Sequence, residues 1–190
     1  MPRPPFLPLI DWPSVFAGGL EWNAWLALAE FPEKRDSMAH AALTLQPPDD
    51  GIQTLDTMTR PIHVVAVAED WCGDVVKHAP VLQLIALRQP LIRVRFVARH
   101  DHPDMFVRFL TNGGEAIPRF VFLSETFVEC GNWGPMPEEH RRWIARGKAC
   151  NDLAAARQKV NQLYEADPQR HQAFRELADL AALAATTEIK

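Results

Sequence analysis

The chain has 190 residues, of which 47% are hydrophobic and 23% are charged, as in an ordinary globular protein. Its 20 Lys+Arg and 24 Asp+Glu give a formal net charge of −4, and no basic block stands out, so the electrostatic signature of a nucleic-acid-binding protein is missing. Three cysteines exclude a disulfide-rich scaffold, and no apolar run reaches the roughly 20 residues of a membrane span. We therefore expect a cytoplasmic globular protein, with neither nucleic acid nor membrane as a partner.

The first 60 residues predict helices. Apolar and aromatic residues recur at helical spacing between residues 20 and 30, and a second helix is expected over residues 32–45. The PPDDG run at residues 47–51 is the strongest break in the chain. We expect residues 1–60 to form a helical N-terminal extension.

A βαβ unit is predicted in the middle of the chain. Residues 62–68 (IHVVAVA) form a nearly continuous apolar run, which is typical of a strand buried on both faces. A helix is expected over residues 73–87. Residues 91–98 then alternate between apolar and arginine side chains, which indicates a strand with one wetter face at a sheet edge. This order of elements indicates the α/β class.

The rest of the chain predicts a β-hairpin among helices. A short helix is expected over residues 103–110, and β-rich runs separated by SET predict the hairpin at residues 120–130. One long helix should run from residue 138 to residue 164, with an apolar stripe facing inward. Pro168 separates it from a final helix rich in alanine and leucine.

Cys72 is the strongest candidate for chemistry. It lies in the DWCGD run at residues 70–74, where the buried strand gives way to a helix. Unpaired backbone N–H groups and the positive end of the helix dipole favour the thiolate there, and the thiolate is the nucleophilic form. The carboxylates of Glu69, Asp70 and Asp74 disfavour a second negative charge, so the expected effect on the thiol is modest.

The residues around Cys72 resemble the active site of the thioredoxin family. The resemblance rests on four motifs in register, which are Trp71-Cys72-Gly73, Pro80, Ile117-Pro118 and Gly134. The whole pattern looks like a bacterial thioredoxin-like subgroup that has WCGD in place of WCxxC and carries a helical N-terminal extension.

The resemblance implies a three-layer α/β/α fold with a central mixed four-stranded sheet and added N- and C-terminal helices. The strand at 62–68 would lie between the edge strand at 91–98 and the hairpin. The helices at 73–87 and 138–164 would flank the sheet. We expect residues 61–165 to form the thioredoxin-like domain and residues 166–190 to form a C-terminal helix packed on it.

The resemblance also implies which residues form the site. In the family a cis-proline faces the cysteine, and the residue before it offers its backbone to an extended substrate. Carried over to this sequence, the catalytic residue is Cys72. The substrate-binding residues are Trp71, Gly73, Asp74, Ile117 and Pro118.

Two departures from the family pattern limit the chemistry. The second cysteine of the family corresponds to Val75, and its buried acid corresponds to Ala66. An intramolecular dithiol–disulfide cycle is therefore excluded at this site. Monothiol chemistry remains, in which Cys72 forms a mixed disulfide or a sulfenic acid and is released by an external thiol.

Two functions stay open at this stage. The first is monothiol redox chemistry at Cys72, with protein or small-molecule thiols and disulfides, glutathione among them, as partners. The alternative is a non-catalytic module that binds a peptide or partner protein in the same groove, because a fold does not by itself imply its usual function. A homodimer built by the extra helices is a further alternative.

The remaining candidates favour structural roles. Cys130 and Cys150 fit apolar packing positions, Cys150 on the stripe of the long helix. The His100-Asp101-His102 run favours a loop over a metal site because no third ligand is near in sequence. We therefore expect no metal and no cofactor. Lys77 and His78 lie about 140° and 240° around the helix from Cys72, so neither is a natural base for its thiol.

Overall fold

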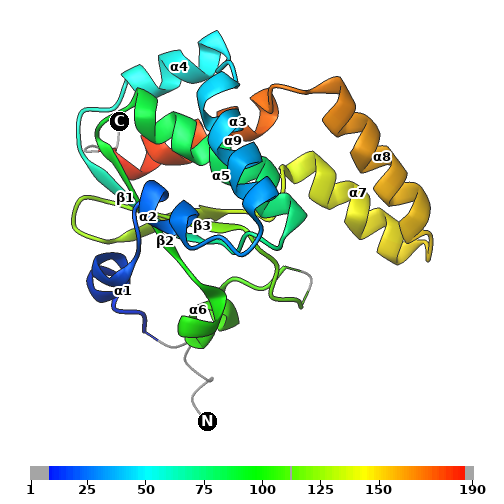
Figure 1. Cartoon of the computed structure of the whole chain (residues 1–190), viewed down its shortest axis with the longest axis horizontal. Coiled ribbons are helices and arrows are strands. Elements are labelled where there is room, and N and C mark those ends of the chain that lie inside the picture. The colour runs from blue at the N-terminus through cyan, green and yellow to red at the C-terminus, as the bar shows by residue number, and fades with distance from the viewer. Residues whose placement is uncertain (1–8, 112, 187–190) are drawn as a thin grey trace, which may run out of the picture.

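The computed structural model describes residues 9–111 and 113–186 (Figure 1). The outer ends of the expected segments 1–60 and 166–190 lie outside these residues. Within the described ranges, no helix combines the length and the apolar character needed to cross a membrane.

A mixed four-stranded sheet forms the centre of the molecule, as predicted. Its strands are β1 (Ile62–Val67), β2 (Ile92–Val97), β3 (Arg119–Leu123) and β4 (Glu129–Trp133). Their order is β2-β1-β3-β4, with β1 parallel to β2 and antiparallel to β3. Every residue of β1 is buried, which explains its continuous apolar run, whereas the edge strand β2 exposes Arg93. The hairpin of β3 and β4 is present, although its second strand lies further along the chain than the sequence suggests.

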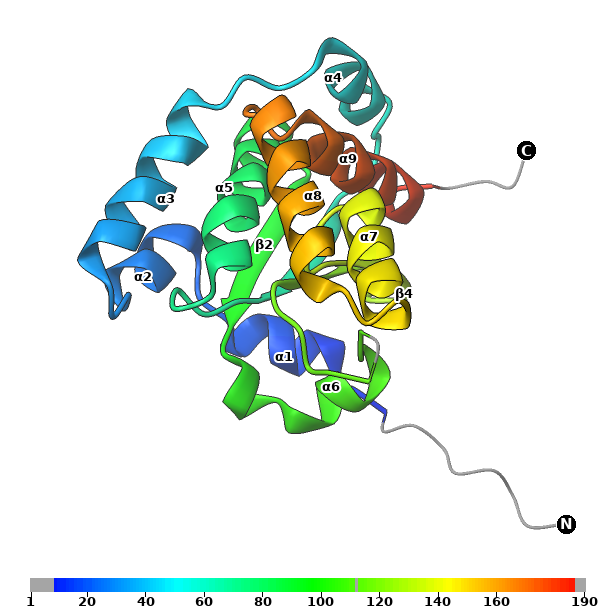
Figure 2. The same cartoon turned by 90° about the vertical axis from the view of Figure 1, so that its right-hand side faces the viewer.

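Helices cover both faces of the sheet and give the predicted three-layer architecture. They are α1 (Trp12–Gly18), α3 (Pro32–Thr44), α4 (Asp49–Asp56), α5 (Gly73–Arg88), α6 (Pro103–Arg108) and α9 (His171–Ala184). One face carries α5 and α9, with α3 packed outside α5 and α4 packed outside α9. The opposite face carries α1 and α6, which lie side by side in Figure 2.

The prediction of one long helix over residues 138–164 is wrong. The segment forms two helices, α7 (Glu138–Ala149) and α8 (Leu153–Ala166), which pack against each other and project from the domain (Figure 1). Asn151 adopts a left-handed backbone conformation (φ 55°), and Asp152 starts α8 by accepting a hydrogen bond from the Ala155 N–H at 3.0 Å. The apolar residues keep their helical spacing across this turn, so their periodicity alone does not reveal that the helix is interrupted. Cys150 ends α7 in an exposed position, contrary to the packing role expected for it.

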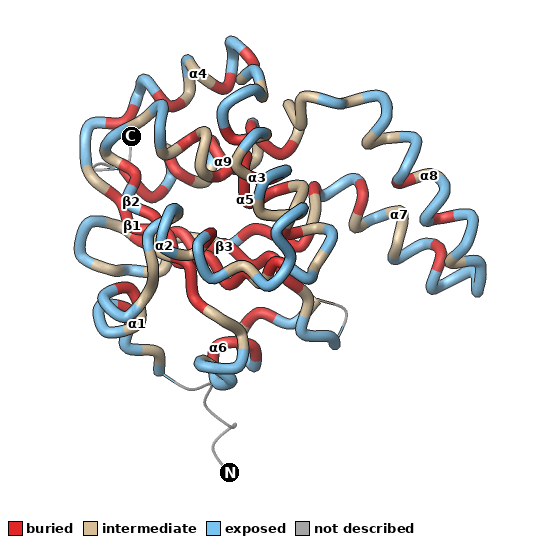
Figure 3. The backbone as a smooth tube through the Cα atoms, in the orientation of Figure 1, coloured by how far each residue is buried: buried red, intermediate tan, exposed pale blue. Residues whose placement is uncertain are grey.

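The helix α9 takes the place on the sheet that was expected for the long helix. It contacts β3, β4 and α5, and it buries an apolar face that includes Phe174 and Leu177. Figure 3 shows buried residues along α9. The sequence predicts this helix and its apolar face, but it was expected on the outside of the sheet. Its burial instead makes α9 part of the central core.

The N-terminal segment covers the edge strand. Between α1 and α2 (Trp22–Ala27), Leu20 exchanges two backbone hydrogen bonds with Phe96 of β2, at 2.8 and 2.9 Å. Gly19 makes this approach feasible, because a Cβ atom there would lie 2.8 Å from the Cβ of Arg95. A single bridge thus satisfies part of the edge while β2 remains the outermost strand.

Candidate functional site

Cys72 lies at the end of the loop that connects β1 to α5. It is the N-cap residue of α5, with an extended backbone (φ −84°, ψ 122°) and no side-chain capping hydrogen bond. The half-buried thiol donates instead to the carbonyl oxygen of Ile117, with Sγ and O 3.4 Å apart. The sulfur therefore stands at a helix N-terminus and beside the backbone of a second loop, 45 residues away in sequence.

The second loop is shaped by proline and glycine. The Ile117–Pro118 and Gly134–Pro135 peptide bonds are both cis. Gly134 has a positive φ of 130°, and a Cβ atom there would overlap the Pro118 carbonyl. This close approach explains why a glycine follows directly after β4, and it holds in place the backbone that faces Cys72.

Trp71 is the exposed aromatic residue beside the thiol. It keeps 47% of its surface exposed, and its indole N–H donates to a carboxylate oxygen of Glu69 at 2.8 Å. Lys34 of α3 donates to the Trp71 carbonyl at 3.1 Å, so the N-terminal extension contacts the Cys72 loop directly. Among the predicted site residues, Trp71 is the one with a large apolar surface open to a partner.

Gly73 and Asp74 occupy the first turn of α5. The side of Gly73 that would carry a Cβ is open apart from Lys77 Nζ at 3.7 Å, so no packing contact requires glycine there. Asp74 lies 3.9 Å from Lys77 Nζ, and its side chain keeps 27% of its surface exposed. Burial raises the pKa of Asp74, and the positive charge of Lys77 opposes the rise.

The two positions at which the sequence departs from thioredoxin are sealed in the core. Val75 and Ala66 have no exposed surface. Val75 faces the interior where a resolving thiol would otherwise stand, and Ala66 pairs with Phe96 and Phe120 in the sheet. Both positions therefore hold buried apolar side chains in place of the thiol and the acid of the family.

A buried polar cluster on the α7–α8 side was not predicted. His78 has no exposed surface, and its Nε2 atom lies 3.0 Å from the Tyr164 hydroxyl. The His78 ring also packs edge-on against Trp133, and the His140 ring lies 4.5 Å from that of Tyr164. Neither ring nitrogen of His140 has a hydrogen-bond partner among the described residues. The sequence offers no local signal for this cluster, because it joins α5 to residues 55 to 86 positions away in the chain.

The titration of this cluster follows from its burial. Desolvation, helped by the charges of Arg170 and Lys77, holds the pKa of His78 well below 6.5. Burial also lowers the pKa of His140. The pKa of Tyr164 is raised by burial and by the negative charge of Asp74, while the positive charge of Arg170 opposes the rise, so the tyrosine lies within electrostatic reach of the first turn of α5. The cluster is thus neutral and adjoins the Cys72 site.

The remaining cysteines and histidines of interest lie apart from this site. All three cysteines are free, and the half-buried Cys130 thiol contacts the Val128 carbonyl within its own hairpin. His100 belongs to a short 3-10 helix, η1 (Arg99–Asp101), and is exposed. Within the part of the chain that the structure describes, no group of His, Cys, Asp and Glu side chains is arranged to hold a metal ion.

A mixed sheet flanked by helices, with a cysteine at a helix start facing a cis-proline, defines a protein of the thioredoxin class. The sequence matches the thioredoxin family over residues 19–156, and the chain belongs to this family. No match was found among curated proteins. Assignment to a WCGD subgroup stays a prediction.

Solved structures share the fold at low sequence identity. The protein of unknown function PA1234 from Pseudomonas aeruginosa superposes with a TM-score of 0.72 at 17% identity, covering 90% of this chain and 97% of that one. An HIV 4E10 epitope-scaffold superposes with a TM-score of 0.73, also at 17% identity, covering 94% of this chain and 100% of the other. Both likenesses concern the fold alone.

Proposed function

We propose that the protein carries out monothiol exchange at Cys72. The observation that carries the proposal is the position of the Cys72 thiol, at the start of α5 and 3.4 Å from the Ile117 carbonyl that precedes cis-Pro118. The partners would be protein or small-molecule disulfides and thiols, with glutathione as the simplest candidate. A reducing compartment such as the cytoplasm would supply the thiol.

The exchange has two balanced steps. The Cys72 thiolate attacks one sulfur of a disulfide, a mixed disulfide forms at Cys72, and the other sulfur leaves as a thiolate that takes up a proton. An external thiol, deprotonated at attack, then attacks the mixed disulfide, regenerates the Cys72 thiol and carries the first partner away as a new disulfide. No second thiol of this chain takes part, in keeping with the buried valine at position 75.

Three neighbouring groups have roles in this proposal. The backbone of Ile117 aligns an extended partner beside the sulfur, and Pro118 keeps that backbone in place. Trp71 offers an exposed apolar surface to the partner. In this proposal Asp74, which lies in the first turn of α5 and whose pKa is raised by burial, relays a proton at the thiol.

The rate of alkylation by iodoacetamide tests the proposal with a matched control inside the chain. Two variants each keep one thiol: Cys130→Ser/Cys150→Ser retains Cys72, and Cys72→Ser/Cys130→Ser retains Cys150. Cys72 begins a helix whereas Cys150 ends one, so the helix dipole favours the thiolate at the first and disfavours it at the second. We expect alkylation of Cys72 at neutral pH to be faster by about tenfold. Equal rates, or a faster Cys150, would contradict a reactive Cys72.

A non-catalytic binding module is the second candidate function. The sealing of Val75 and Ala66 favours it, because the chain has lost both groups that the dithiol cycle uses. Cys72→Ser separates the two candidates in cells whose own copy of the gene has been deleted. Restoration of the normal phenotype by Cys72→Ser supports the module, and failure to restore it at normal protein levels supports the thiol.

A further inference from the structure

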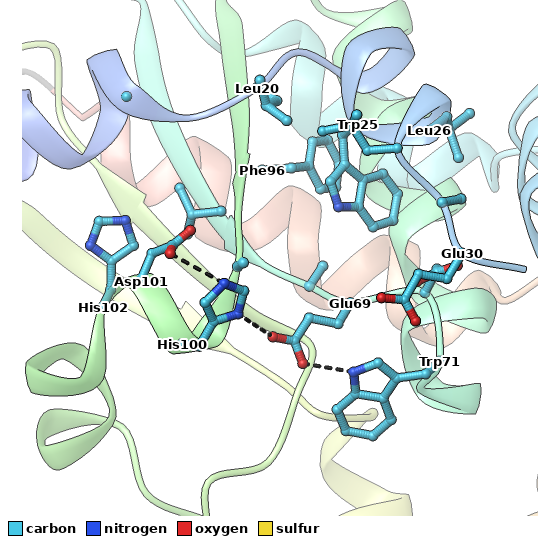
Figure 4. Close-up of a pocket in the computed structure, with 17 residues that line it drawn as sticks. Leu20, Trp25, Leu26, Glu30, Glu69, Trp71, Phe96, His100, Asp101 and His102 are labelled. Atoms are coloured by element: carbon cyan, nitrogen blue, oxygen red, sulfur yellow. Dashed lines mark hydrogen bonds and ion pairs between the residues drawn. The ribbon is translucent and has the colours of Figure 1, made fainter.

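A cavity of about 550 Å³ lies beside the Cys72 loop, where α2, the end of β2 and the loop after β1 meet. We call it the α2 pocket, and it is defined by Trp25, Leu26, Glu30, Glu69, Asp70 and Phe96 (Figure 4). Its volume falls within the range of small-molecule sites. Trp71, which the thiol proposal gives a partner-binding role, also lines it, whereas Cys72 does not, so the pocket adjoins the thiol site and shares Trp71 with it.

The α2 pocket has an aromatic wall. The rings of Trp25 and Phe96 stack with centroids 4.5 Å apart and planes 15° apart. Figure 4 shows both side chains beside Leu26, on the opposite side of the cavity from His100 and Asp101. Such a wall accepts the apolar or aromatic body of a ligand.

The charge of the α2 pocket is negative. Glu30, Glu69, Asp70 and Asp101 line it, and no lysine or arginine is among its lining residues. Glu69 is already engaged, since its two oxygens accept hydrogen bonds from the Trp71 indole at 2.8 Å and the Arg99 backbone N–H at 3.1 Å. Arg99 also approaches Glu69, with Nε 4.0 Å from the carboxylate. The His100 ring lies between Glu69 and Asp101, 3.7 Å from the first carboxylate and 3.2 Å from the second (Figure 4).

Asp70 differs from Glu69 because its charge is not balanced. It is only 8% exposed, and one oxygen accepts a hydrogen bond from the Phe31 N–H at 2.9 Å. Among the residues that the structure describes, no second hydrogen bond and no ion pair reach this carboxylate, and its second oxygen is not sealed from solvent. Lys34, at the start of α3, donates to the Trp71 carbonyl instead. The second Asp70 oxygen is therefore available to a cation that enters the pocket from outside.

We infer that the α2 pocket binds a small organic cation, an amine with an apolar or aromatic body. The ammonium group pairs with Asp70 and, towards the solvent, with Glu30. The body lies against Trp25 and Phe96. A partly enclosed cavity of this size suits a small molecule, and its carboxylates reject an anion of the same shape.

A charge-matched ligand pair tests the inference. The probes are 4-phenylbutylamine and 4-phenylbutyrate, which share a phenylalkyl body and differ in the sign of the charge. Binding is followed by NMR through the indole N–H signals of Trp25 and Trp71. We expect the amine to shift these signals at millimolar concentration and the carboxylate to leave them unchanged. Equal shifts from both probes, or none from the amine, would overturn the inference.

Variants locate the cation site. Asp70→Asn keeps an acceptor for the Phe31 N–H and removes the charge, so the Kd for the amine should rise by about tenfold or more. Glu30→Gln alters an exposed residue that folding does not need, and it should weaken binding by about threefold. Glu165→Gln, on the exposed face of α8, is the matched control and should bind as the wild type does. Wild-type affinity in both Asp70→Asn and Glu30→Gln would overturn the inference.

The inference stands apart from the proposed thiol chemistry. Cys72→Ser removes the thiol and leaves the lining of the α2 pocket intact. We expect this variant to bind 4-phenylbutylamine with unchanged affinity. Loss of amine binding in a folded Cys72→Ser protein would contradict a site of this composition.

Discussion

Acidification from about pH 7 to about pH 5 should destabilise the fold through His78. Burial, above all, and the charges of Arg170 and Lys77 hold the pKa of this histidine well below 6.5 in the folded protein. Above pH 6.5 the ring is neutral in both the folded and the unfolded chain, so His78 adds nothing to the pH dependence. Below that value the unfolded chain takes up a proton that the folded chain does not. The free energy of unfolding then falls as the pH drops below 6.5, with a limiting slope of about 1.4 kcal/mol per pH unit.

The contribution of His78 can be isolated by urea denaturation of the wild type and His78→Gln across this pH range. Glutamine is neutral in both states, and its amide can bond the Tyr164 hydroxyl. The raised pKa of Asp74 acts in the opposite direction, since it favours the folded state as the pH falls, but it acts equally in both proteins. We expect the loss of stability on acidification below pH 6.5 to be smaller in His78→Gln, by at most about 1.4 kcal/mol per pH unit. Identical pH dependence in the two proteins would refute the reasoning.

Three further predictions concern the backbone, the missing thiol and the assembly. Gly134→Ala should lower the free energy of unfolding by more than about 2 kcal/mol, because the new Cβ would overlap the Pro118 carbonyl. Gly73→Ala is the control and should change the free energy of unfolding by less than about 0.5 kcal/mol. Equal effects of the two substitutions in chemical denaturation would contradict this prediction. Val75→Cys should restore a pair of thiols one helical turn apart, so this variant should reduce insulin disulfides while the wild type does not. Robust insulin reduction by the wild type would show that the role given to Val75 is wrong. A homodimer built by the extra helices should give an elution volume in size-exclusion chromatography that shifts with concentration, and a monomer at every concentration would remove this proposal.

The sheet could be predicted from the sequence because each of its strands has a distinct local pattern. The continuous apolar run of β1 reflects burial on both faces, and the alternation in β2 reflects its place at the edge. The approach of Cys72 to Ile117 was inferred from the resemblance and not from spacing, since 45 residues separate the two.

The sequence predictions fail where tertiary contacts override a local pattern. The apolar stripe of residues 138–164 continues across the turn at Asn151 and Asp152, although an Asn-Asp pair is itself a signal for a helix end and a new helix start. The buried contact between His78 and Tyr164 depends on how the α7–α8 hairpin folds back, and no sequence period encodes it.

The α2 pocket could not be predicted from the sequence either. Its walls come from the N-terminal segment, from the loop after β1 and from the end of β2. Asp70 resembles a surface acid when the DWCGD run is taken alone. Its burial follows from the turn after α2, where the Phe31 N–H binds it.

Formation of a mixed disulfide with oxidised glutathione would show directly that Cys72 carries out monothiol exchange. The protein that retains only Cys72 and the protein that retains only Cys150 are each incubated with oxidised glutathione and weighed by intact-protein mass spectrometry. We expect one glutathione adduct on the Cys72 protein, its removal by reduced glutathione, and little adduct on the Cys150 protein. A Cys72 protein that stays unmodified, or that reacts no faster than the Cys150 protein, would contradict monothiol exchange at Cys72.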